Sequence, residues 1–133
     1  MKLTGTWYNE LGSKMVLRGR DSNITGTYQT KVGDAKGIYR LVGRTDTDHD
    51  QSQAVGWIVA WQNEYGSSDS VTAWSGQLQE IDGLETIVTT WLLTGETDPN
   101  NDWRSTLVGK DVFTRAQPTQ EEIEKTLQRA SHP

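Results

Sequence analysis

Apolar and polar residues alternate along most of this chain, from residue 3 to about residue 115. Such alternation is typical of β-strands, because successive side chains of a strand point to opposite faces of the sheet. Short clusters of Gly, Asn, Asp and Ser separate the alternating stretches, as in ELGS at 10–13 and IDGL at 81–84, and they favour hairpin turns. The pattern predicts eight strands, over residues 3–9, 14–18, 24–31, 37–44, 54–63, 70–80, 84–94 and 104–115.

Eight short antiparallel strands joined by hairpins can close an up-and-down β-barrel, which leaves no sheet edge exposed. We therefore expect an all-β fold with an eight-stranded barrel in residues 1–115. Residues 116–133 are expected to form a tail with a short helix, because Thr119 and Glu122 fit a capping box ahead of apolar residues spaced four apart. With so few apolar residues to anchor it, a frayed tail is the alternative.

The faces of the strands separate an apolar set from a polar set that shares its inward direction. Val55, Trp57, Val59 and Trp61 alternate inward on one strand, and on the last strand Asp111 lies in phase between the apolar Leu107 and Phe113. The polar members of the inward set gather at one end of the barrel: Asn9, Ser13, Tyr28, Thr30, Ser70, Thr72 and Asp111. In a dry core each unpaired hydroxyl would cost about 1–3 kcal/mol, and a lone charge more.

Two interpretations of this polar set remain. The side chains satisfy one another and ordered waters in an ordinary core, or they line a pocket for one small ligand, which a barrel of this size can hold. Aromatic walls with a few convergent polar groups are typical of small-molecule sites. We favour the pocket, because the whole set lies in phase at the strand ends.

Composition narrows the classes of function. A length of 133 residues fits one domain, and the absence of cysteine excludes disulfides, thiolate metal sites and a cysteine nucleophile. A net charge of −5 argues against a nucleic-acid partner. No run approaches the roughly 18 apolar residues of a membrane helix, and no hydrophobic targeting segment precedes LTGTWYN. Localisation therefore stays open between secretion after signal removal and an intracellular protein.

An enzyme is the second class of function considered. Carboxylate pairs can cleave a glycoside, and the candidates here are Glu64 with Asp69, Asp98 with Asp102, and the group Glu80, Asp82 and Glu85. All of them lie in or beside turns, where solvated acids are ordinary. The two imidazoles, His49 and His132, lie in polar stretches without a nucleophile motif. We therefore expect no catalytic residues.

Three further features have ordinary explanations. DTDHD at 46–50 has oxygen ligands but lacks the spacing of a known calcium loop, so we expect no metal. A lectin would stack sugars on tryptophans at an exposed rim, whereas five of the six tryptophans here share the inward phase of the strands. Asn23 begins a glycosylation sequon, a pattern that occurs often by chance.

Six segments form a more specific pattern: LTGTWYNELGS, ITGTYQTKVGDA, GWIVAWQN, SVTAWSGQ, TTWLLTG and DWRSTLVGKDVFT. In order and spacing they resemble the strands of the avidin and streptavidin family of biotin-binding proteins. WYNELGSKM and QPTQEEI are especially similar to its fungal tamavidin branch. The similarity covers residues 3 to about 123. It implies a non-catalytic barrel without a cofactor, which binds biotin and biotinylated molecules with high affinity, assembles as a homotetramer and sequesters the vitamin.

The resemblance also implies roles for individual residues. Asn9, Ser13 and Tyr28 match the donors to the ureido oxygen of biotin, and Thr30 and Asp111 match the acceptors for its two N–H groups. Trp61, Trp74, Trp91 and Leu93 match the apolar walls, Thr72 a hydroxyl near the thioether sulfur, and Ser70 a donor to the valerate carboxylate. Val32, Gly33 and Asp34 match the loop that covers the ligand, and Trp103 matches the tryptophan that a neighbouring subunit inserts.

Two site residues depart from the family's usual pattern. Thr30 stands where serine is common, and it retains the hydroxyl. Asp34 stands where the streptavidin branch has asparagine, near the carboxylate end of the ligand. If its side chain faces the ligand, two like charges weaken binding and make it salt dependent. The loop YGSSDS at 65–70 also differs, which leaves the outer pocket open.

Overall fold

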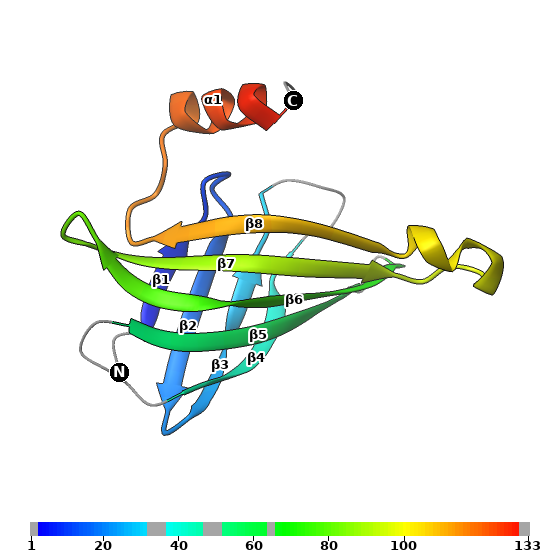
Figure 1. The fold of residues 1–133 in the computed structure, drawn as a ribbon, viewed down its shortest axis with the longest axis horizontal. Helices are drawn as coiled ribbons and strands as arrows, with labels where there is room; N and C mark the ends of the chain where they lie inside the picture. The colour runs from blue at the N-terminus through cyan, green and yellow to red at the C-terminus, as the bar shows by residue number, and fades with distance from the viewer. Residues whose placement is uncertain (1–2, 32–36, 47–51, 64–65, 131–133) are drawn as a thin grey trace.

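The fold is a closed barrel of antiparallel strands, in which each strand pairs with its neighbours in the sequence and β8 returns to β1. This computed structural model describes residues 3–31, 37–46, 52–63 and 66–130. Figure 1 shows the strands wrapped around one interior, with the C-terminal helix outside the barrel. The predicted fold class is confirmed.

Eight strands and two helical segments make up this part of the chain. The strands are β1 (Gly5–Tyr8), β2 (Lys14–Arg20), β3 (Asn23–Gln29), β4 (Tyr39–Thr45), β5 (Ser52–Asn63), β6 (Gly66–Ile81), β7 (Leu84–Gly95) and β8 (Thr106–Thr114). The helical segments are the 3₁₀ helix η1 (Pro99–Arg104) and the α-helix α1 (Gln120–Ala130).

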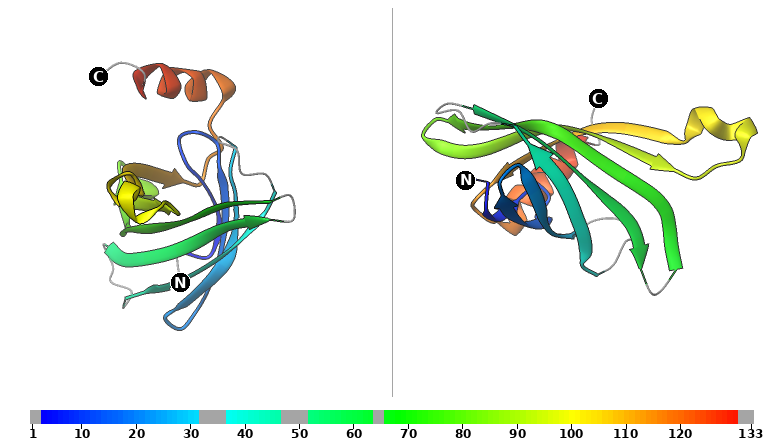
Figure 2. Two further views of the ribbon diagram at one scale, coloured as in Figure 1. Left: turned by 90° about the vertical axis from the view of Figure 1, so that its right-hand side faces the viewer. Right: turned by 90° about the horizontal axis from the view of Figure 1, so that it is seen from below.

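Every strand differs from its predicted range at one end or both, by up to four residues at the start of β6, and two of these differences have a clear local cause. Strand β1 ends at Tyr8, because the Oδ1 atom of Asn9 accepts hydrogen bonds from the backbone N–H groups of Leu11 and Ser13 and begins a turn there. Strand β8 begins at Thr106 and not at residue 104, because η1 precedes it. Figures 1 and 2 show β7, η1 and the start of β8 projecting beyond β1–β4.

The structure therefore corrects the prediction for Leu107. Its position in the alternation predicted an inward, buried side chain, but in this chain it is 60% exposed. It pairs with Leu93 on the projecting part of β7 and β8. There the alternation continues after the barrel interior has ended.

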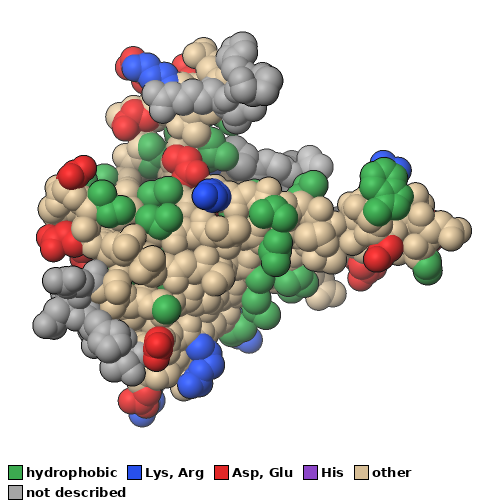
Figure 3. Space-filling model, in the orientation of Figure 1, with side chains coloured by type: hydrophobic (Ala, Val, Ile, Leu, Met, Phe, Trp, Pro, Cys, Tyr) green, Lys and Arg blue, Asp and Glu red, His purple; other side chains and the backbone are tan. Residues whose placement is uncertain are grey.

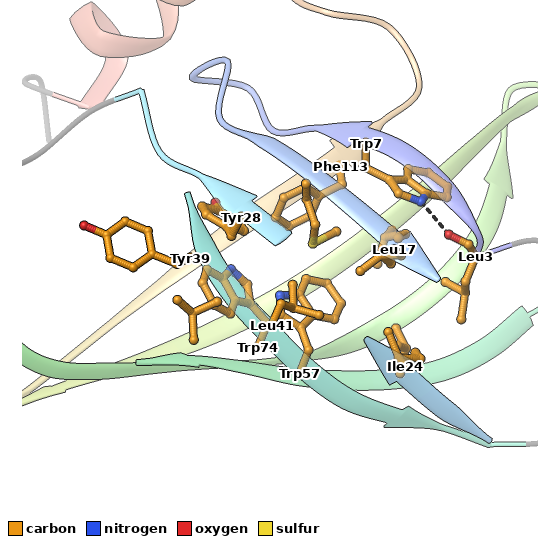
Figure 4. Close-up of a cluster of buried hydrophobic side chains, with 14 of the residues drawn as sticks. Leu3, Trp7, Leu17, Ile24, Tyr28, Tyr39, Leu41, Trp57, Trp74 and Phe113 are labelled. Atoms are coloured by element: carbon orange, nitrogen blue, oxygen red, sulfur yellow. Dashed lines mark hydrogen bonds between the residues drawn. The ribbon is translucent and has the colours of Figure 1, made fainter. Parts of the chain in front are cut away.

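The core changes character from one end of the barrel to the other. Figure 4 shows Leu3, Leu17 and Ile24 at one end, and Tyr28 and Trp74 toward the other. All of these side chains are buried. Burying an aromatic side chain removes about 150–250 Å² from water, which is worth about 4–6 kcal/mol at ~25 cal/mol per Å². The aromatic half therefore stabilises the barrel strongly although its residues have polar tips.

The tail contains the predicted helix. The hydroxyl of Thr119 accepts from the N–H of Glu122 at 3.1 Å, and Glu122 Oε1 accepts from the N–H of Thr119 at 2.9 Å, so the capping box is formed. Ile123 is buried and lies against Gly12 in the β1–β2 turn, where an added Cβ would approach its Cδ1 atom to 3.1 Å. No helix within the described residues is both long and apolar enough to cross a membrane.

Candidate functional site

Three hydrogen-bond donors converge at the polar end of the barrel. Asn9 and Ser13 come from the two ends of the β1–β2 turn, and Tyr28 comes from β3; all three side chains are buried. The Nδ2 atom of Asn9 donates to the hydroxyl of Tyr28 at 3.5 Å, and Ser13 also bonds to Tyr28. One acceptor placed among them can therefore meet all three donors.

The donors are oriented by bonds to the backbone. Because Asn9 Oδ1 accepts from the N–H groups of Leu11 and Ser13 at 3.0 and 2.9 Å, the amide nitrogen is the end that faces Tyr28. The Ser13 hydroxyl accepts from the N–H of Lys31 at 3.3 Å, which leaves its proton available for another partner. Burial, with the charge of Asp111 adding to it, raises the pKa of Tyr28, so its hydroxyl remains a protonated donor.

A single buried carboxylate on β8 provides the acceptor. The Nε1 atom of Trp74 donates to Asp111 Oδ2 at 2.9 Å, and the Thr89 hydroxyl donates to the backbone oxygen of Asp111 at 2.9 Å. Desolvation is the main cause that raises the pKa of Asp111 from 3.8 to about 6; the charge of Glu10 acts in the same direction, and the hydrogen bonds from Trp74, Asn9 and Trp91 act against it. At neutral pH Asp111 is therefore ionised.

Aromatic rings surround these polar groups. The ring centroid of Tyr28 lies 5.7 Å from that of Trp61 and 5.0 Å from that of Trp74. The ring centroids of Tyr39 and Trp61 are 5.0 Å apart. The Nε1 atom of Trp61 donates to the Thr72 hydroxyl at 2.8 Å. Trp61 also lines a pocket of about 410 Å³ at the end of the barrel, together with Ser70. Fixed donors, a fixed acceptor and aromatic walls can hold a small planar polar ligand by both its faces and its edges.

The comparisons with known proteins agree with this geometry. A model of the Avidin family matches residues 1–116. The chain belongs to the avidin family. It is 37% identical to Avidin-related protein 4/5 of Gallus gallus, over 85% of this chain and 77% of that protein. It is 36% identical to Avidin of Gallus gallus, over 90% and 81%, and 30% identical to Afifavidin of Afifella pfennigii, over 92% and 75%.

Membership of the avidin family gives the function its general class. The family consists of non-catalytic proteins that bind biotin as a ligand, so this chain is not an enzyme, and biotin binding follows at the level of the family. The family binds its ligand without a cofactor. Within the described residues no group of three or more His, Asp and Glu side chains could hold a metal ion.

The other residues expected at an avidin-like site vary in exposure. Thr30, Ser70, Trp91 and Leu93 are half-buried toward the open end, whereas Thr72 is buried beside Trp61. Trp103 is 80% exposed on η1. Val32, Gly33 and Asp34 lie outside the described residues. The structure thus brings together the deep part of the predicted set and leaves Trp103 apart from it.

The residues that raised the alternatives of a glycosidase, a metal site and a lectin do not form such sites in the described part of this avidin-family barrel. The acidic groups Asp98 with Asp102 and Glu80 with Asp82 are exposed. Glu64, His49 and His132 lie outside the described residues, as does most of DTDHD. Trp7, Trp57, Trp61 and Trp74 are buried, which is unlike the exposed rim of a sugar-stacking lectin.

Three residues that contact the site were not selected from the sequence. Tyr39 packs on Trp61, and its phase with the buried Leu41 was the available signal. Thr89 has the same phase as Trp91 on β7, which was the available signal, and its hydroxyl donates to the backbone oxygen of Asp111. Glu10 lies in a turn, and nothing in the alternation indicates that it contacts β8.

Proposed function

We propose that this chain binds D-biotin tightly and reversibly, without changing it chemically. Asn9, Ser13 and Tyr28 donate to the ureido oxygen, while Thr30 and Asp111 accept from the two ureido N–H groups. The observation that supports this assignment best is the fixed polarity of the pocket. Donors whose orientation is set by the backbone face one way, and a carboxylate ionised at neutral pH lies on β8. A cyclic urea has the complementary polarity.

The remaining site residues bind the rest of the ligand in this proposal. Trp61, Trp74, Trp91 and Leu93 contact the bicyclic ring and the valeryl chain, Thr72 lies near the sulfur, and Ser70 donates to the carboxylate. Val32, Gly33 and Asp34 form the covering loop. Because the rings and hydroxyls are packed before the ligand arrives, little side-chain entropy is lost on binding. High affinity then appears mainly as slow release.

We also propose that the chain assembles as a homotetramer. Outward-facing apolar residues are paired directly across five strands: Val42, Ile58, Ala73, Leu92 and Val108. All of them except Ala73 are exposed in the single chain, and Figure 3 shows hydrophobic side chains in a band across this face. An apolar face of this extent favours contact with a second copy. The exposed Trp103 then contacts the site of a neighbouring subunit.

Calorimetric titration with biotin, run alongside size-exclusion chromatography with light scattering, tests both proposals. We expect one biotin bound per chain and a mass of four chains. Asp111→Ala is expected to release biotin faster without losing the barrel, as judged by circular dichroism. An equal release rate in the wild type and this variant would contradict the ureido assignment. Binding of this kind is suited to sequestering the vitamin, which we propose as the biological role.

A further inference from the structure

The barrel is closed between β1 and β8 by very little backbone pairing. Strand β1 pairs with β2 over four residues, from Gly5 to Tyr8, but with β8 only through Tyr8 and Thr114. The ladder stops there because the chain turns away at Asn9. Continuing the register by two residues would place Glu10 opposite Val112.

At this position the side chain of Glu10 bonds to β8 in place of a backbone hydrogen bond. Its Oε2 atom accepts a hydrogen bond from the backbone N–H of Val112 at 3.0 Å. The peptide group that contains this N–H also contains the carbonyl of Asp111, which accepts from the Thr89 hydroxyl at 2.9 Å. One peptide group is therefore held from β7 by Thr89 and from the β1 side by Glu10.

This peptide sets the direction of the Asp111 side chain, whose carboxylate accepts from Trp74 at 2.9 Å. We propose that Glu10 is a positioning residue for Asp111, which acts through the Val112 amide and holds the carboxylate where it accepts a ureido N–H. The inference rests on the proposed function, because it assigns a supporting role within the same site. Glu10 itself contacts no ligand in this arrangement.

Glu10 affects Asp111 in a second way, through its charge. The ionisable groups that act on Asp111 are Glu10, from the turn after β1, and the neutral Tyr28, from β3. Strands β6 and β7 present Trp74, Trp91 and Thr89, and the neighbouring Lys110 on β8 is exposed. Removing the charge of Glu10 should therefore make Asp111 easier to ionise, whereas removing the whole side chain should also release the Val112 amide.

Two substitutions separate these effects. Glu10→Gln keeps an oxygen that can accept from Val112 and removes the charge, while Glu10→Ala removes both. Glu80→Gln is the matched control, because Glu80 is exposed and lies at the β6–β7 hairpin. In release measurements with radiolabelled biotin at pH 7.5, we expect Glu10→Ala to dissociate about three- to tenfold faster than the wild type, since a bond to a charged acceptor at a half-exposed site is lost. Glu10→Gln and Glu80→Gln should stay within about twofold of the wild type.

A double-mutant cycle shows whether Glu10 acts through Asp111. In an Asp111→Ala background, Glu10→Ala should add no further acceleration. An equal acceleration in both backgrounds would mean that Glu10 supports the barrel in general, and the inference would be wrong.

A measurement without ligand separates this inference from the proposed function. The indole N–H signal of Trp74 in the NMR spectrum, followed from pH 4 to pH 8, reports the ionisation of Asp111. Its midpoint should move to lower pH in Glu10→Gln and stay in place in Glu80→Gln. A midpoint that Glu10→Gln leaves unchanged would mean that the Glu10 carboxylate is not held beside the Asp111–Val112 peptide, as its bond to the Val112 amide requires, and this overturns the inference even if Glu10→Ala fails to fold. If the wild type does not bind biotin, the proposed function fails, while the midpoint still decides whether Glu10 acts on Asp111.

Discussion

Replacing Asp111 with asparagine is expected to stabilise the ligand-free barrel while weakening its hold on biotin. Asp111 is 9% exposed, and its pKa is raised from 3.8 to about 6, chiefly because burial disfavours the charge. An asparagine has nearly the same shape and keeps an oxygen that can accept from Trp74. It carries no charge to desolvate, and it offers a weaker acceptor to a ureido N–H.

The magnitude follows from linkage between ionisation and folding. A rise of about two units in the pKa of Asp111 corresponds to a free energy of about 3 kcal/mol, at ~1.36 kcal/mol per unit. The native state holds the Asp111 proton more tightly than the unfolded chain does. The stability that this provides is therefore complete below pH ~4 and is lost as the pH rises through about 6. The advantage of Asp111→Asn over the wild type should grow by about 2–2.5 kcal/mol between pH 4 and pH 7, because a small part of the change has already occurred at pH 4.

Urea unfolding followed by tryptophan fluorescence measures this difference at pH 4, 5, 6 and 7, with a fixed protein concentration and no biotin. Asp82→Asn is the matched control, because Asp82 is an exposed hairpin residue with φ of 52°, a conformation that asparagine also tolerates. The control should show no comparable growth with pH. If the difference between Asp111→Asn and the wild type is independent of pH, the buried-charge argument is refuted.

Three further predictions concern other parts of the chain. Gly109→Ala should weaken biotin binding in calorimetry, because an added Cβ would overlap the ring of Trp91 and displace it. Thr119→Ala removes half of the capping box and should reduce the helical circular dichroism signal, at a cost of about 1 kcal/mol to the helix. Trp103→Lys should lower the oligomer mass in light scattering and speed biotin release; an unchanged mass and rate would contradict its proposed place at a subunit contact.

The sequence predicted the barrel and its deep polar residues because both follow from a period of two. Once a strand is in phase with one buried tryptophan, every second residue shares its direction, and this places Thr72 with Trp74 and Asp111 with Phe113. The capping box was also predictable, because its two partners are only three residues apart. Local patterns of this kind need no knowledge of the rest of the fold.

Features that depend on contacts between distant segments could not be predicted in this way. The period of two continues to Leu107 although the barrel interior has ended there, so phase alone gave the wrong exposure. Glu10 bonds to Val112, which is 102 residues away in the chain, across a closure whose register exists only in the folded barrel. Its sequence context is that of an ordinary solvated acid in a turn.

The polar end of the barrel gains its rigidity from bonds outside the β-ladder. Asn9 is fixed by two N–H groups of its turn, Ser13 by the N–H of Lys31, and Asp111 by Trp74 and by the peptide that Thr89 and Glu10 hold. Ordering such a side chain on binding would cost about 0.5–1.5 kcal/mol each, and here that cost falls on folding. The buried charge of Asp111 also destabilises the ligand-free barrel. A ligand that accepts from the donors and donates to Asp111 offsets both costs, so biotin should raise the unfolding temperature most where Asp111 is ionised, above pH ~6.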